Sequence, residues 1–183
     1  MHHHKKCLVN KINNNSFTLL VQMNVILDMS TFSLADIFFT EKKQNVLIKG
    51  YFTKLIYSNE HLVISNIYYQ LPFITQDMTV NNREIYIQCD MNSNHNLDIL
   101  QTLTDIEYRI LNHYKRTYNL SANISTNIDK KLKSGILKMY NEGNHLLTRV
   151  TNIVVKISGI WETTDEIGLA IRFCPGNVYN LSN

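Results

Sequence analysis

Two pairs of β-rich segments, each joined by a short polar turn, constrain the fold of this chain more than any other feature. Residues 46–58 and 61–71 form the first pair, and residues 153–161 and 167–173 form the second. Each pair predicts an antiparallel hairpin, because two β-prone runs on either side of a short polar stretch can fold back on each other. We expect two further strands, at residues 84–90 after a turn at 81–83, and at residues 17–28, where a buried helix is the alternative.

One long segment has a helical period instead. Residues 97–118 carry apolar side chains three and four positions apart, which predicts one long helix or a helix with a break near Thr104. Residues 31–39 predict a short helical turn capped by Ser33. Residues 130–140 fit either a strand or a helix, and a turn is expected at 141–144. Strands followed by a helix and then by strands predict a mainly β, α+β fold. Its sheet should be mostly antiparallel, and a small closed or partly open barrel with the helix inserted near 97–118 satisfies this order.

The composition fits one globular domain. A chain of 183 residues with 44% hydrophobic residues, 6 Gly and 2 Pro is neither disordered nor low in complexity. We expect a flexible N-terminal segment at residues 1–16, a single domain at 17–176 and a short tail at 177–183. No apolar run approaches the ~20 residues that cross a bilayer, and residues 1–16 lack the apolar core of a secretory signal. An intracellular protein without a membrane partner is therefore expected.

Motifs that indicate catalysis or a cofactor are lacking in the sequence. It contains no GxSxG, GxxxxGK[ST] or HExxH pattern, so we expect no enzymatic activity, no catalytic residue and no cofactor. Asp165 and Glu166 fall in a predicted hairpin turn, where paired acids are usually solvated. The histidines at positions 2–4 and Cys7 lack a preorganised geometry, so no metal site is expected. Cys89 alternates with apolar residues and is predicted to be a small buried hydrophobe, and the odd, widely spaced cysteines predict free thiols.

Basic residues interleaved with aromatic residues on predicted strands are the most informative functional pattern. A cationic groove can follow phosphates while exposed rings stack on bases. If the polar faces of the strands converge on one side of a barrel, they line a nucleic-acid-binding surface made of Lys49, Tyr51, Tyr57, Tyr86, Lys156 and Arg172. A basic run at residues 130–133 could extend a phosphate track, although such runs are usually solvated faces. The alternative for each tyrosine is a β-forming residue whose hydroxyl reaches water. A net charge of +3 permits this partner without demanding it.

The C-terminal segment carries a family resemblance. Residues 154–161, VVKISGIW, followed by residues 162–173, ETTDEIGLAIRF, resemble the closing segment of small proteins of large DNA viruses. Those proteins are similar in outline to OB-fold single-stranded DNA-binding proteins. Residues 105–114, DIEYRILNHY, and 132–138, LKSGILK, fall in the expected order for that group.

This resemblance implies a small antiparallel OB-like β-barrel that binds single-stranded DNA without sequence specificity, as an accessory in replication or recombination. The partners it implies are single-stranded DNA, or RNA in its place, with replication proteins and further copies of the chain. A viral origin would place the protein in the host nucleus or cytoplasm. Such proteins often carry an acidic C-terminal tail, whereas this chain ends NLSN, so recruitment of partners through a tail is not expected.

A protein from a different class is the alternative. A viral structural component or a protein-protein interaction module would expose an apolar surface and would have no salt-dependent affinity for nucleic acid.

Overall fold

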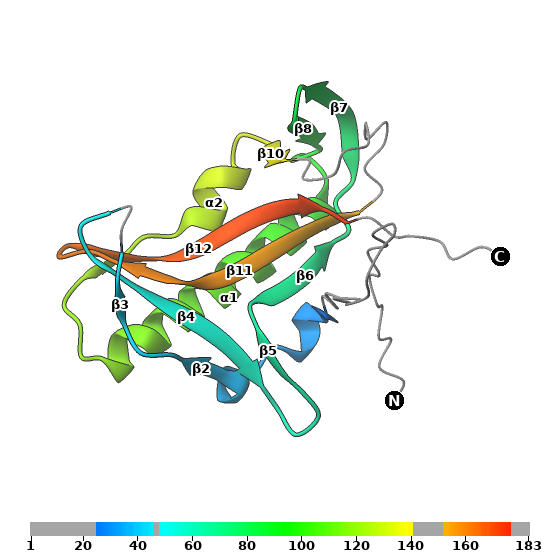
Figure 1. The fold of residues 1–183 in the computed structure, drawn as a ribbon. Coiled ribbons are helices and arrows are strands. Elements are labelled where there is room, and N and C mark those ends of the chain that lie inside the picture. The colour runs from blue at the N-terminus through cyan, green and yellow to red at the C-terminus, as the bar shows by residue number, and fades with distance from the viewer. Residues whose placement is uncertain (1–24, 46–47, 141–151, 177–183) are drawn as a thin grey trace, which may run out of the picture.

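The computed structural model describes residues 25–45, 48–140 and 152–176, which form two β-sheets and one long helix (Figure 1). The elements are β1 (Ile26–Leu27), the 3-10 turns η1 (Met29–Thr31) and η2 (Leu34–Asp36), β2 (Ile37–Phe39), β3 (Lys43–Gln44), β4 (Tyr51–Ser58), β5 (Val63–Ser65), β6 (Ile67–Leu71), β7 (Thr75–Asn81), β8 (Glu84–Cys89), α1 (Asn94–Thr117), β9 (Asn123–Ile124), α2 (Asn127–Leu132), β10 (Ile136–Tyr140), β11 (Ile153–Glu162) and β12 (Glu166–Pro175). The predictions for residues 1–16, 17–24, 141–144 and 177–183 lie outside the described residues.

Strand β11 organises the larger sheet because two different strands pair with its two halves. The sheet has nine strands in the order β1-β6-β11-β12-β9, with β4 also paired to β11 and carrying β2, β3 and β5. The first half of β11, from Ile153 to Ile157, pairs with β6, and the second half, from Gly159 to Glu162, pairs with β4. Gly159 allows this change of partner, since a Cβ there would lie 2.3 Å from the carbonyl oxygen of Thr53.

Both predicted hairpins are confirmed, and the first contains a break. Strands β11 and β12 pair antiparallel, as do β4 and β5. The strand predicted at 61–71 is divided at Asn66, whose φ of 72° is left-handed, a conformation that Asn tolerates better than most residues. As a result β5 stays on β4 while β6 moves to β11. The predicted turn at 81–83 contains Asn82 at φ 56°, and it joins β8 to β7, a strand that the sequence analysis did not predict.

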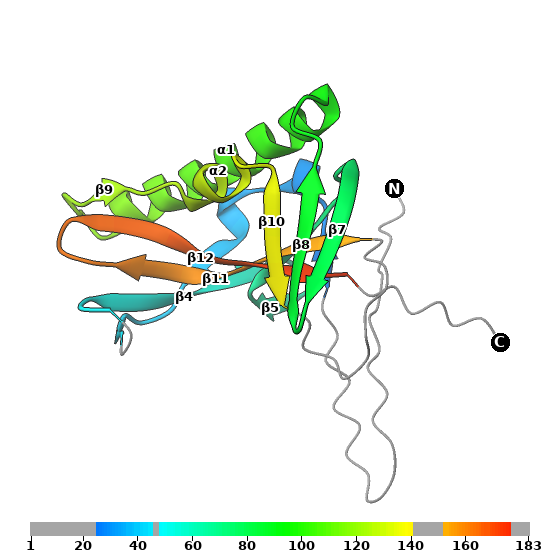
Figure 2. The same cartoon turned by 90° about the horizontal axis from the view of Figure 1, so that it is seen from above.

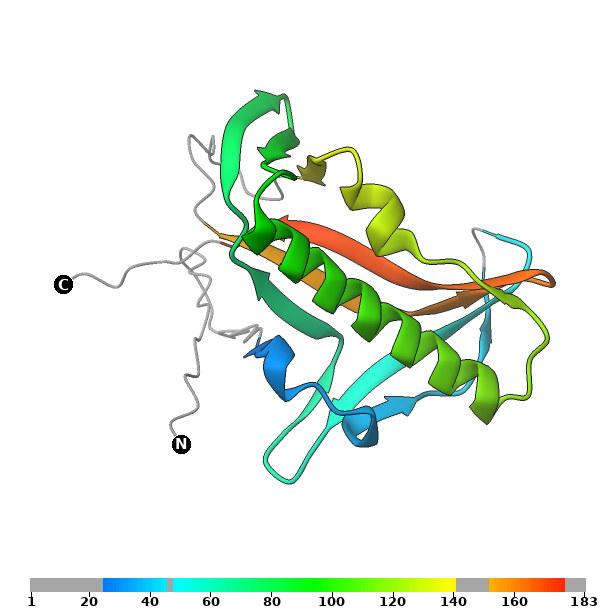
Figure 3. The same cartoon turned by 180° about the vertical axis from the view of Figure 1, so that it is seen from behind.

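The long helix is confirmed and has no break at Thr104. Figure 3 shows α1 running along one face of the larger sheet, and Figure 2 shows both helices on the same side of the β11–β12 layer. The buried residues of α1 recur three and four positions apart because they face that sheet: Ile99, Leu103, Ile106, Ile110 and Tyr114. One hydrophobic cluster joins them to both sheets. The helical turn predicted at residues 31–39 is present only in part, as η2, with the Ser33 hydroxyl accepting the Ala35 amide; residues 37–39 form strand β2 instead.

A second, three-stranded sheet, β10-β8-β7, stands at one end of the larger sheet and runs across the direction of β11 and β12 (Figure 2). Residues 130–140, which fitted a strand or a helix, contain the end of α2 and the whole of β10, separated at Gly135, which has a φ of 70°. The mainly β, α+β fold with mostly antiparallel pairing is confirmed. Over the described residues the sheets are open, so the small OB-like barrel is not confirmed.

Candidate nucleic-acid interface

Lysine, arginine and tyrosine side chains from both sheets lie next to one another and form a row. We call this row the basic-aromatic surface and define it, in spatial order, as Tyr68, Lys156, Arg172, Tyr140, Lys138 and Tyr86. Adjacent members are in contact or in register. Lys156 lies opposite both Tyr68 and Arg172, and its Nζ is 5.8 Å from the centre of the Tyr68 ring. The Arg172 guanidinium lies 5.9 Å from the centre of the Tyr140 ring.

The part of the row on the larger sheet faces away from α1. Val155 and Ile157 are fully buried on the helix side of β11, so the intervening Lys156 points to the opposite face. Tyr69 is likewise buried on the helix side of β6, which directs Tyr68 outward. Side chains directly opposite each other on neighbouring strands share a face, so Tyr68, Lys156 and Arg172 lie on the outer face together.

The part of the row on the smaller sheet follows from the alternation of β10. Leu137 and Met139 are buried, whereas Lys138 and Tyr140 are on the exposed face. Tyr86 of β8 lies directly opposite Lys138, and the Lys138 ammonium is 5.5 Å from the Tyr86 ring centre and 5.3 Å from that of Tyr140. Tyr140 keeps 43% of its surface exposed, so part of this residue can meet a ligand beside the Lys138 and Arg172 cations.

A groove separates β10 from β12, where the two parts of the row meet. It has a volume of about 500 Å³ and is lined by Lys131, Lys138, Arg172 and Tyr140 together with apolar residues of both strands. Lys131 reaches it from α2, and its Nζ lies 3.5 Å from the carbonyl oxygen of Ile171. Cations and a tyrosine therefore line a concave site of the size that takes a small ligand or part of a larger one.

A carboxylate of the described residues, that of Glu84, lies within this cationic surface. Its Oε1 is 2.6 Å from the Lys138 Nζ, and its Oε2 accepts a 2.5 Å hydrogen bond from the Tyr86 hydroxyl. The hydrogen bond from Lys138 lowers the pKa of Glu84, and the same bond raises the pKa of Lys138, so both groups are charged near neutral pH. In the free protein the Lys138 ammonium is therefore already paired with an anion.

The structure brings together three of the residues predicted for the interface and separates the other three. Tyr86, Lys156 and Arg172 belong to the basic-aromatic surface. Tyr57 is only 6% exposed and packs in the core opposite Ile37 and Ile64, because its face of β4 is the one covered by α1. The predicted exposure of the Tyr57 ring is wrong.

Lys49 and Tyr51 lie elsewhere in the fold. Strand β4 begins only at Tyr51, so Lys49 sits in the bend before it and not on a strand face. Tyr51 is 50% exposed, but it lies opposite Glu162 at the far end of β11 from Lys156. The Glu162 side chain points toward α1, so Tyr51 is also on the other face of the sheet from Lys156. The expected convergence of all the polar faces is therefore incorrect for these residues.

Three members of the surface were missed from the sequence: Tyr68, Lys138 and Tyr140. A usable signal existed for two of them, since residues 136–140 alternate between buried and exposed positions with Lys138 and Tyr140 on the exposed face. Tyr68 and Tyr69 are adjacent tyrosines on one strand, and only the packing of α1 decides which of the two is buried.

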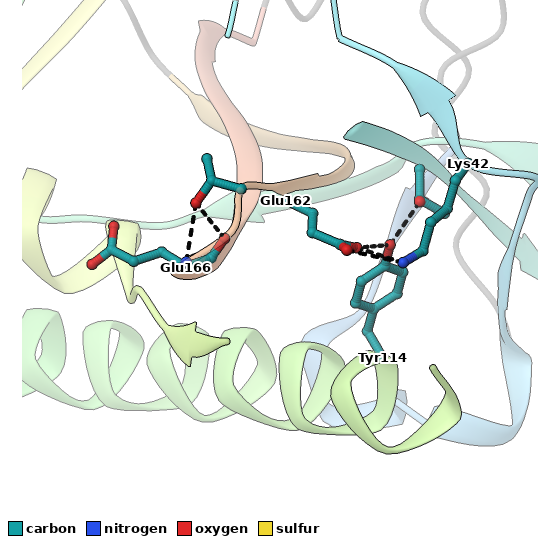
Figure 4. A network of polar contacts seen from close by, with 6 residues as sticks. Lys42, Tyr114, Glu162 and Glu166 are labelled. Carbon is teal, nitrogen blue, oxygen red and sulfur yellow. Dashed lines mark hydrogen bonds and ion pairs between the residues drawn. The ribbon is translucent and has the colours of Figure 1, made fainter. Parts of the chain in front are cut away.

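A second polar network, shown in Figure 4, joins the end of α1 to the sheet. The buried Tyr114 hydroxyl donates to Glu162 Oε2 at 2.8 Å and accepts from the Thr53 hydroxyl at 2.8 Å, while Lys42 forms an ion pair with Glu162 at 2.7 Å. Burial raises the pKa of Tyr114, so its proton stays in place. Each group has a partner, and the network positions α1 on the sheet.

Several residues outside the basic-aromatic surface have ordinary structural surroundings. Cys89 is a buried free thiol whose pKa burial raises to about 11. Asp165 and Glu166 are exposed in the β11–β12 turn, where the Thr163 hydroxyl accepts both of their amides. Trp161 lies opposite Gly168, and a Cβ on that glycine would be 2.3 Å from the indole. Within the described ranges, no three His, Cys, Asp or Glu side chains gather as metal ligands would.

The chain matches no protein-family model, no curated protein and no solved structure. The class of protein therefore rests on the fold and the site themselves, which are an open, mainly antiparallel α+β fold with a basic-aromatic surface along its outer face. No helix in the described part of the chain has the length and apolar character needed to cross a membrane.

Proposed function

We propose that this protein binds single-stranded DNA without sequence specificity through the basic-aromatic surface, as a non-enzymatic accessory in replication or recombination. The observation that carries the proposal is the uninterrupted row from Tyr68 to Tyr86, in which lysine and arginine side chains lie between tyrosine rings. Cations at these positions can neutralise phosphates, and half-exposed rings can stack on any base. The expected result is a sequence-tolerant affinity that depends strongly on salt.

An OB-like relationship is part of the same proposal. Strands β10 and β12 face each other across the groove, at the place where a closed barrel would have a hydrogen-bonded ladder. Single-stranded RNA, replication proteins and further copies of the chain are the other partners to be tested.

The direct test is the fluorescence anisotropy of labelled oligo-dT titrated with the protein at several salt concentrations. We expect the single strand to bind more tightly than a duplex of the same length, with an RNA strand measured alongside. Three or four cations in contact with phosphates predict a slope of roughly −2 to −3 for the logarithm of the association constant against that of the salt concentration. An absence of binding to every nucleic acid at low salt would overturn the proposal.

Tyr140 provides the residue-level test of stacking. We expect Tyr140→Leu to weaken oligo-dT binding roughly tenfold, because a stacked base contributes about 1 to 3 kcal/mol. Tyr51→Leu is the matched control, since Tyr51 is similarly exposed but lies on the other face of the sheet, and it should change the affinity less than twofold. Equal losses in the two variants would show that the surface is wrongly placed.

The alternative, a protein-protein interaction module, is favoured by a different observation. Phe38 on β2 and Val63 on β5 are 52% and 69% exposed, and both strands pair with β4. Large exposed apolar side chains of this kind are typical of surfaces that bind other proteins. If no nucleic acid binds at low salt, this region of β2 and β5 is the place to look for a partner.

A further inference from the structure

Glu84 is an acidic residue of the described chain that lies among the cations of the basic-aromatic surface and works against an anionic ligand. Its carboxylate accepts from both Lys138 and Tyr86, so two donors that could hold a phosphate are occupied in the free protein. We propose that Glu84 is an internal competitor of the nucleic-acid phosphate: it holds Lys138 in the free protein, is displaced when a strand enters the groove, and thereby limits the affinity. This inference rests on the proposed function.

The register of the smaller sheet places Glu84 beside two residues that line the groove. Glu84 lies directly opposite Tyr140, and Tyr86 lies directly opposite Lys138, so the four side chains form one block on the exposed face of β8 and β10. Lys138 and Tyr140 both line the groove, together with Arg172 from β12. Strand β10 therefore has Glu84 of β8 on one side and the groove on the other. A phosphate in the groove approaches the Lys138 ammonium from the groove side, opposite to Glu84.

The ion pair is open enough to exchange. The side chains of Glu84 and Lys138 keep 34% and 43% of their surface exposed, so the incoming phosphate does not have to open a buried core. An exposed ion pair contributes little to stability, because water already solvates both charges well. A phosphate that replaces the carboxylate restores a charge-assisted hydrogen bond to Lys138 and can accept the Tyr86 hydroxyl proton as well. The exchange replaces one anion with another and costs little free energy.

The exchange also predicts an effect on salt dependence. While Glu84 is paired with Lys138, part of the lysine charge is neutralised before the strand arrives. Without the carboxylate, Lys138 carries its full charge when the strand arrives. Its contact with a phosphate then releases one more of the cations condensed on the DNA than the contact in wild type does. Removal of Glu84 should therefore both tighten binding and steepen the dependence on salt.

The test compares Glu84→Gln with Asp165→Asn in oligo-dT anisotropy titrations. The two variants make the same change in net charge, but Asp165 lies in the exposed turn at the other end of β12. We expect Glu84→Gln to bind roughly fivefold more tightly than wild type and to steepen the salt slope by about 0.7. Asp165→Asn should change the affinity less than twofold at physiological salt, because charges beyond about 8 Å are largely screened.

Lys138→Gln supplies the second arm of the experiment. If Glu84 acts by occupying Lys138, the gain from Glu84→Gln should disappear in the Lys138→Gln background. An equal gain in both backgrounds would indicate general electrostatics and would overturn the inference. Thermal unfolding of each variant verifies that the smaller sheet remains folded.

The outcomes separate this inference from the proposed function. If wild type binds oligo-dT but Glu84→Gln binds no better than Asp165→Asn, the competitor role of Glu84 is wrong and the proposed function stands. If neither wild type nor Glu84→Gln binds at low salt, both are wrong.

Discussion

Replacing Lys156 and Arg172 together by glutamate is expected to weaken oligo-dT binding by at least about a hundredfold at low salt. The two residues lie directly opposite each other on β11 and β12, in the centre of the basic-aromatic surface. Charge reversal removes two phosphate contacts and places two carboxylates where the strand should pass. The salt slope should also fall by about 1.4, since each contact with a single strand contributes about 0.7.

The fold should tolerate this double substitution. Lys156 and Arg172 are already like charges on facing positions, so two glutamates reproduce a repulsion of similar size. Lys43→Glu with Lys49→Glu is the matched control, because both lysines are exposed and the change in net charge is the same. The control should lose only a few-fold in affinity. A comparable loss in both double variants would mean that overall charge, and not this surface, holds the nucleic acid.

Replacing Glu107 by alanine is expected to lower the free energy of unfolding by about 3 kcal/mol. Glu107 is a completely buried residue of α1, and its two carboxylate oxygens accept the amides of Asn127 at 2.8 Å and Ile128 at 3.0 Å. These amides begin α2, whose own N-cap residue Thr126 makes no side-chain hydrogen bond to it. Without Glu107, the half-buried N–H of Asn127 and the buried N–H of Ile128 at the start of α2 lose their acceptor.

Urea unfolding followed by circular dichroism measures the effect of this substitution. Asp105→Ala is the control, because Asp105 is an exposed acid on the same helix that forms an ion pair with Arg109 at 3.5 Å. It should change the stability by less than about 0.5 kcal/mol. If Glu107→Ala costs no more than this control, the carboxylate is not needed to start α2.

The protonation of Glu107 adds a pH dependence with a definite sign. Burial raises the pKa of Glu107 above its usual value of about 4.3, although the two amide hydrogen bonds partly oppose the shift. The native state therefore keeps this proton to a higher pH than the unfolded chain does. The stabilisation linked to this proton is fully present below about pH 4.3 and is lost as the pH rises through the native pKa, whereas the two amide hydrogen bonds remain.

Glu107→Gln does not titrate, so it isolates this contribution. The stability of wild type relative to Glu107→Gln should decrease as the pH rises from about 4 to 8. Unfolding curves of both proteins at several pH values provide the measurement. A difference that stays constant or increases with pH would contradict a raised pKa.

Local patterns were sufficient for the elements that depend on near neighbours. The period of residues 97–118 predicted α1, and two β-prone runs around a short turn predicted the β11–β12 hairpin. Lys156 and Arg172 were also predicted on the correct face, because each is a single charged residue between apolar positions on a strand, and the alternation directs its side chain away from theirs.

The burial of individual tyrosines and the composition of the basic-aromatic surface depended on contacts between residues far apart in the chain. Strand β4 has apolar side chains on both faces, so its sequence could not show that α1 covers the face of Tyr57 and not that of Phe52. The packing of α1 also decided that Tyr69 is buried and that Tyr68 faces outward. Strand β11 pairs with β6 along its first half and with β4 along its second half. Strand β10 lies across the groove from β12, so Lys138 and Tyr140 line the same groove as Arg172. The sequence alone therefore determined the helix, the hairpins and the outward-facing charges, since these follow from periodicity. The tertiary structure decided which charges and rings share a surface, because strand pairing and helix packing are non-local.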